Sequence, residues 1–102
     1  MANLKDLQKE IYQNKVNHNF NLTDINLEFC YIMDEVGEAH QAYIRNLDNM
    51  GEELADIAIY LLGLSEILNI DLEKEIINKI NKNKKRVYYK DENGVLRKKE
   101  GE

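Results

Sequence analysis

The sequence contains few of the residues on which several common architectures depend. Among its 102 residues there is no proline, no tryptophan, five glycines and one cysteine, Cys30. One cysteine excludes a disulfide within the chain and a zinc site built from several thiolates. Because proline and glycine interrupt helices and are scarce here, we expect a mostly helical protein.

Long apolar runs and an excess of positive charge are also missing. No segment reaches the roughly 18 consecutive apolar residues of a membrane span, and the first residues lack the apolar part of a signal peptide. We therefore expect a cytoplasmic protein with no membrane partner. The 14 Lys and Arg residues are outnumbered by 19 Asp and Glu residues, which gives a net charge of −5. General nucleic-acid binders usually carry the opposite sign, so no nucleic-acid partner is expected.

Several local motifs of enzyme active sites are absent as well. The two histidines, His18 and His40, are isolated and do not have a metal-binding spacing. The only serine, Ser65, lies outside any G-x-S-x-G context. Without a Walker-type or G-x-G-x-x-G loop, any phosphate must be bound through side chains and metal ions.

Apolar residues recur at helical spacing in four segments. This periodicity predicts an all-α fold with helices over about 3–17, 24–46, 50–69 and 71–86. Thr23 is expected to cap the second helix, and Asn49 with Glu52 resembles a capping box at the start of the third.

The end of the chain has a different pattern. Residues 87–102 place Asn93-Gly94 between short apolar runs, which is a strong signal for a β-hairpin. A frayed tail is the alternative. No linker or internal repeat interrupts the chain, so residues 1–102 are expected to form one domain.

Two acidic pairs are the most informative feature. Glu35 and Glu38 lie on one side of the second helix, and Glu53 and Asp56 lie on one side of the third. Both pairs border apolar stripes, which comprise Ile25, Ile32, Val36, Ala39 and Tyr43 in the second helix and Ile57, Leu61, Leu64 and Leu68 in the third.

Packing these two stripes together would turn both acidic pairs toward a shared cleft. Four carboxylates in one cleft repel one another unless they are protonated, hydrated or neutralised by cations. Carboxylate oxygens suit Mg²⁺ or Mn²⁺. For either pair alone, solvated surface carboxylates are the simpler interpretation, whereas two pairs on consecutive helices favour a metal site.

Other residues are candidates for contacts to a substrate. In the fourth helix, Lys79, Asn83 and Arg86 fall on or beside the apolar stripe and could meet phosphate oxygens; side chains that extend to solvent at a helix end are the alternative. Possible base or sugar contacts are Phe20 and Asn21 in the first loop, together with Glu28 and Tyr31 on the stripe of Glu35.

Over most of its length the chain resembles the MazG-like, all-α nucleoside triphosphate pyrophosphohydrolases. The resemblance rests on Glu35-x-x-Glu38, the run Gly51–Asp56 with Glu53-x-x-Asp56, Lys79-Ile80-x-x-Asn83-x-x-Arg86 and the tail Asn93–Leu96. It implies a four-helix MazG-like bundle that hydrolyses an NTP or dNTP to the monophosphate and pyrophosphate with Mg²⁺, for which Mn²⁺ can substitute. By position, the catalytic metal ligands would be Glu35, Glu38, Glu53 and Asp56, and the phosphate contacts would be Lys79, Asn83 and Arg86.

Two positions depart from the family pattern. Asp34 stands where many members have glutamate, and Asn49-Met50 stands where some members have lysine. Two other functions remain open at this point. One is a phosphoribosyl-ATP pyrophosphohydrolase, which belongs to a related helical family, and the other is a non-catalytic helical interaction or regulatory module.

Further apolar residues lie away from the proposed inner stripes. They are Leu22, Phe29, Met33 and Ile44 around the second helix, and Ile59 and Leu62 in the third. A single chain of 102 residues has too few helices to cover both sides of these two. We therefore expect a homodimer or homotetramer.

Overall fold

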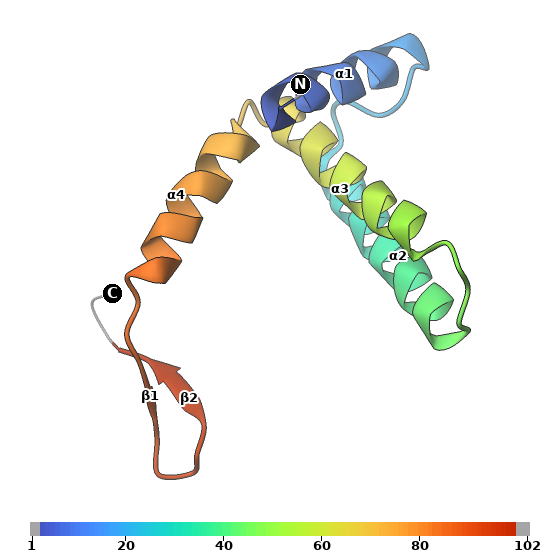
Figure 1. Cartoon of the computed structure of the whole chain (residues 1–102). Coiled ribbons are helices and arrows are strands. Elements are labelled where there is room, and N and C mark those ends of the chain that lie inside the picture. The colour runs from blue at the N-terminus through green and yellow to red at the C-terminus, as the bar shows by residue number, and fades with distance from the viewer. Residues whose placement is uncertain (1–2, 100–102) are drawn as a thin grey trace. The chain divides into compact units, whose positions relative to one another are not determined.

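The structure is a computed structural model in which residues 3–99 are described (Figure 1). It contains α1 (Leu4–Asn17), α2 (Ile25–Ile44), α3 (Met50–Ile67), α4 (Leu72–Lys84), β1 (Tyr88–Lys90) and β2 (Leu96–Lys98). The predicted all-α fold with a short C-terminal hairpin is confirmed, and the helix bounds lie within two residues of the expected ones. Of the helices within residues 3–99, none is both long enough and apolar enough to cross a membrane.

The first three helices end in the same kind of turn. Asparagine adopts the left-handed conformation after each of them, with φ of 56°, 55° and 59° at Asn19, Asn46 and Asn69. The next residue then donates its N–H to a carbonyl in the last turn of the helix, as Phe20 does to Lys15 at 2.9 Å. Asparagine here takes the place that glycine usually has, which explains how a chain with five glycines makes three tight turns.

One predicted N-cap is wrong, and the other is at the predicted residue but lacks the predicted capping box. Asp24, not Thr23, caps α2, because its backbone is extended and its side chain accepts a hydrogen bond from the Leu27 N–H at 3.1 Å. Asn49 does precede α3, but its side chain makes no capping bond. Instead, its amide donates to the Glu53 carboxylate at 3.0 Å, so the expected box with Glu52 does not form.

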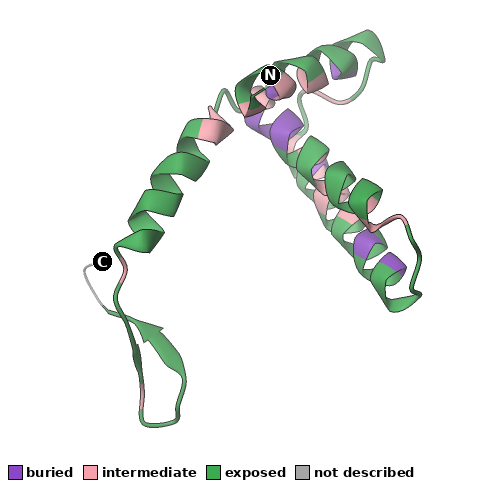
Figure 2. Ribbon diagram, viewed as in Figure 1, coloured by how far each residue is buried: buried purple, intermediate pink, exposed green. Residues whose placement is uncertain are grey.

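The described chain divides into two compact units, one up to Leu72 and one from Glu73 onward. In the first unit α3 packs against both α1 and α2 (Figure 1). Few apolar residues are buried, and they comprise Ala39, Ala42, Leu62 and Leu64. In Figure 2 the buried positions are short purple stretches on helices that are otherwise exposed or half-buried. Gly63 lets α1 approach α3, since a Cβ atom there would lie 3.2 Å from the Ile11 side chain.

The packed side of α2 is rotated relative to the expected stripe. Val36 and Tyr43 were expected to face α3, but they are 48% and 69% exposed. In α3, Leu61 and Leu68 are also exposed, while Leu62, expected on an outer surface, is buried. In each helix, one row of buried and half-buried positions instead recurs at spacings of three and four. The rows comprise Ile25, Glu28, Ile32, Glu35, Ala39 and Ala42 in α2 and Met50, Glu53, Ile57, Tyr60 and Leu64 in α3. We call these two rows the α2–α3 seam.

The second unit consists of α4 and the hairpin. No residue of α4 is buried, and every residue of β1 and β2 is exposed. The antiparallel strands pair Tyr89 with Arg97 at their centre. Asp91 organises the turn, because its carboxylate accepts the N–H groups of Asn93 and Val95 at 2.9 Å each, and Gly94 supplies the positive φ of 80°.

Candidate functional site

Three glutamates from α2 and α3 converge in the first unit. Glu35, Glu38 and Glu53 each contribute one carboxylate oxygen, and these three oxygens all lie within 4.8 Å of one another. Glu35 and Glu53 occupy the α2–α3 seam itself and are half-buried, whereas Glu38 is exposed. The expected convergence of the two acidic pairs is thus seen for three of the four residues. We call these three the glutamate cluster.

Asp56, the fourth expected ligand, is not part of this group. It is exposed on α3 one turn beyond Glu53. Its charge nevertheless acts on Glu35 and raises the pKa of that carboxyl. Asp56 therefore borders the glutamate cluster without joining it.

The electrostatics of the glutamate cluster favour a bound proton or cation. Burial is the largest cause that raises the pKa of Glu35, followed by the charge of Glu38. In addition, the Oε2 atoms of Glu35 and Glu53 are buried and have no hydrogen-bond partner among the described residues. A buried carboxylate oxygen without a partner is costly, so these atoms need a ligand. Because all the donors are oxygens, they fit a hard divalent cation.

The loop before α3 orients one of these carboxylates. Asn49 holds the Oε1 atom of Glu53 through its amide nitrogen, at 3.0 Å. The Oδ1 atom of Asn49 is itself buried without a partner among residues 3–99. Asn49 therefore positions Glu53 from the place where some family members have lysine. Asp34, the other departure from the family pattern, is exposed and lines an open groove of about 690 Å³ that also reaches Glu38 and Glu53.

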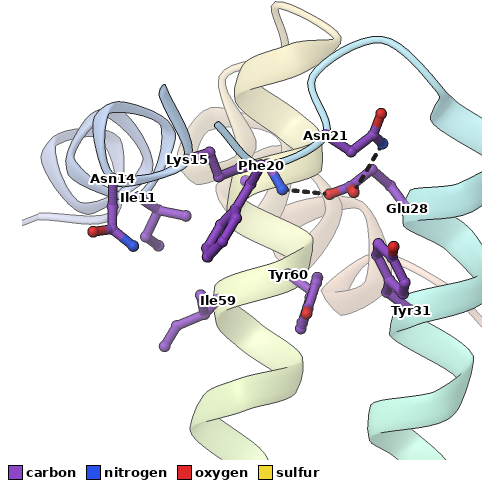
Figure 3. Close-up of a pocket in the computed structure, with 10 residues that line it drawn as sticks. Ile11, Asn14, Lys15, Phe20, Asn21, Glu28, Tyr31, Ile59 and Tyr60 are labelled. Atoms are coloured by element: carbon purple, nitrogen blue, oxygen red, sulfur yellow. Dashed lines mark hydrogen bonds and ion pairs between the residues drawn. The ribbon is translucent and has the colours of Figure 1, made fainter. Parts of the chain in front are cut away.

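A cavity of about 580 Å³ lies in the same unit between α1, α2 and α3 (Figure 3). Its aromatic walls are Phe20, Tyr31 and Tyr60, and the rings of Tyr31 and Tyr60 are 5.8 Å apart and tilted by 49°. Burial raises the pKa of the Tyr60 phenol, and the charges of Glu35 and Glu28 raise it further. Tyr31 and Tyr60 belong to α2 and α3, the same two helices that carry the glutamate cluster. The four expected base or sugar contacts all line this cavity, namely Phe20, Asn21, Glu28 and Tyr31.

Glu28 forms a buried ion pair that the sequence analysis missed. The Lys15 ammonium contacts its Oε1 atom at 2.8 Å, and the Asn21 amide donates to its Oε2 atom at 3.1 Å (Figure 3). The side chains of Lys15 and Glu28 are only 9% and 1% exposed. The sequence did contain a signal for this pair. Lys15 follows Ile11 by four residues and so lies on the buried side of α1, where a lysine requires a partner of opposite charge.

Comparison with known proteins agrees with this site. The model of the MazG-like family matches residues 20–101. The chain belongs to the MazG-like family. Among solved structures, it is similar to the MazG-like pyrophosphohydrolase of cyanophage S-2L, determined with dGDP and three catalytic Mn²⁺ ions per active site. The two are 26% identical, the match covers 97% of this chain and 99% of the phage chain, and the TM-score is 0.69. No curated protein matches.

The expected phosphate contacts of this MazG-like protein lie in the second unit. Lys79 and Asn83 belong to α4, and Arg86 follows it. The Arg86 charge is the largest cause that lowers the pKa of Lys79, followed by desolvation and the charges of Lys82 and Lys98. Positive side chains thus gather here, and the buried Nε atom of Arg86 has no partner among the described residues. Their contact with a substrate phosphate stays a prediction.

Proposed function

We propose that this MazG-like protein is a divalent-metal-dependent nucleotide pyrophosphohydrolase, which hydrolyses an NTP or dNTP to the monophosphate and pyrophosphate. The observation that carries the proposal is the glutamate cluster, with three oxygens within 4.8 Å and two buried oxygens without a partner. The same unit contains an aromatic cavity of about 580 Å³, large enough for a nucleobase, whose lining includes residues of the same two helices. Further support comes from the phage relative, whose structure contains a nucleotide and Mn²⁺.

In this proposal, Glu35, Glu38 and Glu53 hold Mg²⁺ or Mn²⁺, with Asp56 as a further ligand. When bound, such a cation would supply positive charge against the phosphate oxygens and would lower the pKa of a water molecule that it holds. Asn49 orients Glu53, since its amide holds the Oε1 atom and leaves the buried Oε2 atom for the metal. The remaining residues bind the substrate, with Phe20, Tyr31 and Tyr60 enclosing the base and Lys79, Asn83 and Arg86 binding the phosphate chain.

The test is an assay of both products over a panel of NTPs, dNTPs and phosphoribosyl-ATP, with Mg²⁺ and with Mn²⁺. We expect monophosphate and pyrophosphate in equal amounts, which distinguishes this reaction from the release of single phosphates. In isotopically labelled water, attack at the α-phosphorus places the label in the monophosphate. Turnover of phosphoribosyl-ATP alone would favour the related histidine-pathway activity. Failure to hydrolyse any member of the panel with either metal would contradict the proposal and favour a non-catalytic interaction module.

We also propose that the protein is a homodimer or homotetramer. Phe29, Met33 and Ile44, expected to be outward-facing, are between 51% and 73% exposed. Of the other residues expected there, Ile59 lines the cavity, Leu22 is half-buried and Leu62 is buried. Exposed apolar groups of this size along one helix are typical of an interface between subunits. Light scattering at micromolar concentration tests this, and the mass of a single chain, 12.0 kDa, would contradict it.

A further inference from the structure

The ion pair between Lys15 and Glu28 lies in the wall of the aromatic cavity and is not part of the glutamate cluster. Replacing a buried ion pair with apolar side chains is often neutral or stabilising, so stability alone does not explain its presence. The pair also lines the cavity in which the proposed substrate would place its base. A role in binding that base would explain why both charges are kept.

Both members of the pair have unused hydrogen-bonding capacity. An ammonium has three N–H donors, and among the described residues Lys15 uses one of them, on Glu28. A carboxylate offers about four lone-pair directions, and Glu28 uses two, for Lys15 and Asn21. The cavity wall therefore presents a donor and an acceptor side by side, with the Lys15 Nζ and Glu28 Oε1 atoms 2.8 Å apart.

Charge and shape indicate which part of a nucleotide fits here. Glu28 neutralises Lys15, so the pair has no net charge to attract a triphosphate. The surrounding aromatic side chains, Phe20, Tyr31 and Tyr60, suit a planar ring. Adjacent donor and acceptor groups complement an edge of a base that carries an acceptor next to a donor.

On the basis of the function proposed above, we propose that Lys15 and Glu28 determine base specificity and select bases with a carbonyl beside a ring N–H. Lys15 donates to the carbonyl oxygen, and Glu28 accepts the ring N–H. Guanine, hypoxanthine, uracil and thymine carry this edge. For a base held in this same orientation, adenine and cytosine place an amino group against Lys15 and an unprotonated ring nitrogen against Glu28, which reverses the donor and the acceptor.

The burial of the pair makes this selection effective. Glu28 is 1% exposed, so a base that occupies the cavity and makes no bond to it leaves a buried polar group unpaired. Asn21 keeps Glu28 in place, because its amide nitrogen donates both to Glu28 and to the Asp24 carbonyl at 2.8 Å. Sites built in this way discriminate strongly against substrates that leave buried polar groups unpaired.

Two matched pairs of substrates test the proposal in the wild-type protein. ITP and ATP differ at C6 and in protonation of the adjacent ring nitrogen, and UTP and CTP differ in the same way at C4. The pair to compare is the purine or the pyrimidine pair, whichever the protein hydrolyses faster. In that pair we expect kcat/KM for the substrate with the carbonyl group, ITP or UTP, to exceed that for ATP or CTP by about tenfold or more. Equal values, or a preference for the amino base, would overturn the proposal even if hydrolysis is fast.

Variants then connect the preference to the ion pair. The double variant Lys15→Met/Glu28→Gln removes both charges and leaves no buried charge unpaired, and we expect it to lose most of the preference. The control variants Lys9→Met and Glu10→Gln make the same changes at exposed positions of α1 and should keep it. If the double variant keeps the wild-type ratio, Lys15 and Glu28 do not select the base.

Measurements of nucleotide binding distinguish a failure of this proposal from a failure of the proposed function. If no nucleotide is hydrolysed, the proposed function fails, and calorimetry with IMP and AMP still measures base preference in the wild-type protein. Tighter binding of IMP than of AMP, lost in the double variant, would support the selection of the base. Equal affinity, or no binding of either, would overturn it. The comparison of IMP with AMP in the wild-type protein still tests the proposal if the double variant does not fold.

Discussion

The two units of the chain differ in which side chains they bury. In the unit up to Leu72, four polar or charged side chains are buried, and comprise Gln8, Lys15, Glu28 and Ser65. In the unit from Glu73 onward, α4 buries nothing, while Ile77 and Leu96 are 53% and 64% exposed. Both units thus expose apolar side chains, but among the described residues only the first unit buries polar ones. Buried polar groups and exposed apolar groups both call for an explanation by binding.

The side-chain hydrogen bonds inside each unit also differ in how far apart their partners lie along the chain. In the first unit, the Gln8 amide donates to the Glu66 carboxylate at 2.9 Å, and Lys15 pairs with Glu28. These bonds join different helices. In the second unit, the Asp91 carboxylate bonds only within its own hairpin, up to Arg97 at 3.0 Å. Substitutions in the first unit should therefore affect the whole unit and its function, and those in the hairpin should act locally.

The largest expected effect is on turnover. Glu53→Gln keeps the shape and the bond from Asn49 but removes one charge from the glutamate cluster, so kcat/KM should fall by about hundredfold or more. The melting temperature should not fall, because less repulsion remains in the metal-free protein. The matched control is Glu52→Gln, an exposed neighbour on α3, which should keep wild-type turnover. We expect Asp56→Asn to lower turnover as well, and wild-type activity at saturating Mg²⁺ would remove Asp56 from the ligand set.

The next largest effect is on stability. Lys15→Met leaves Glu28 buried and unpaired, which should cost about 3–5 kcal/mol of unfolding free energy. Adding Glu28→Gln to this variant should recover much of the loss, as measured by urea denaturation. Lys9→Met, at an exposed position of the same helix, should have little effect. A loss of the same size in the double variant would show that packing of the lysine stem, not its charge, is what matters.

Divalent cations should stabilise the first unit. A ligand that binds only the folded state adds about 2.7 kcal/mol at a hundredfold excess over Kd, which raises the melting temperature by roughly 10 °C or more in a domain of this size. Without nucleotide the rise should be smaller, since Mg²⁺ often depends on substrate phosphates as ligands. NaCl at matched ionic strength controls for screening of a chain with a net charge of −5. Equal shifts with Mg²⁺, Mn²⁺ and NaCl would identify the glutamates as ordinary surface charges.

A smaller effect should be visible in the pH dependence of the metal-free protein. The pKa of Glu35 is raised above its ordinary value of 4.5, mainly by burial. Its contribution to stability is therefore present below that value and is lost as the pH rises through the raised pKa. As the pH is increased from below 4.5 through the raised pKa, the melting temperature of the wild type should fall relative to that of Glu35→Gln, both measured with a chelator present. A constant difference between the two proteins would show that Glu35 is not perturbed.

The smallest effect should be confined to the hairpin. Hydrogen bonds from the Val95 N–H and the Arg97 side chain lower the pKa of Asp91, so its contribution is present above the ordinary value of 3.8 and is lost as the pH falls through the lowered pKa. At neutral pH, Asp91→Asn should speed hydrogen exchange at the Asn93 and Val95 amides. Melting of the first unit should not change, and Glu92→Gln in the same turn serves as the control. A loss of protection in α2 or α3 would contradict the local role.

The sequence alone was sufficient for the features that depend on neighbouring residues. The four helices, the Asn93-Gly94 hairpin and the two acidic pairs were all predictable, because helix spacing and turn geometry are decided within a few residues. The family could also be predicted, since its motifs consist of the same short spacings.

Only the tertiary structure decided which side of each helix is packed. One residue corresponds to a rotation of about 100° around a helix, so a prediction that is wrong by one residue assigns the wrong side chains to the packed side. In the structure Val36 and Tyr43 are exposed, and Glu35 lies in the α2–α3 seam. The pairing of Lys15 with Glu28 depends in the same way on how α1 and α2 meet around α3. Such rotations are determined by side chains from other helices, and the periodicity of one helix contains no information about them.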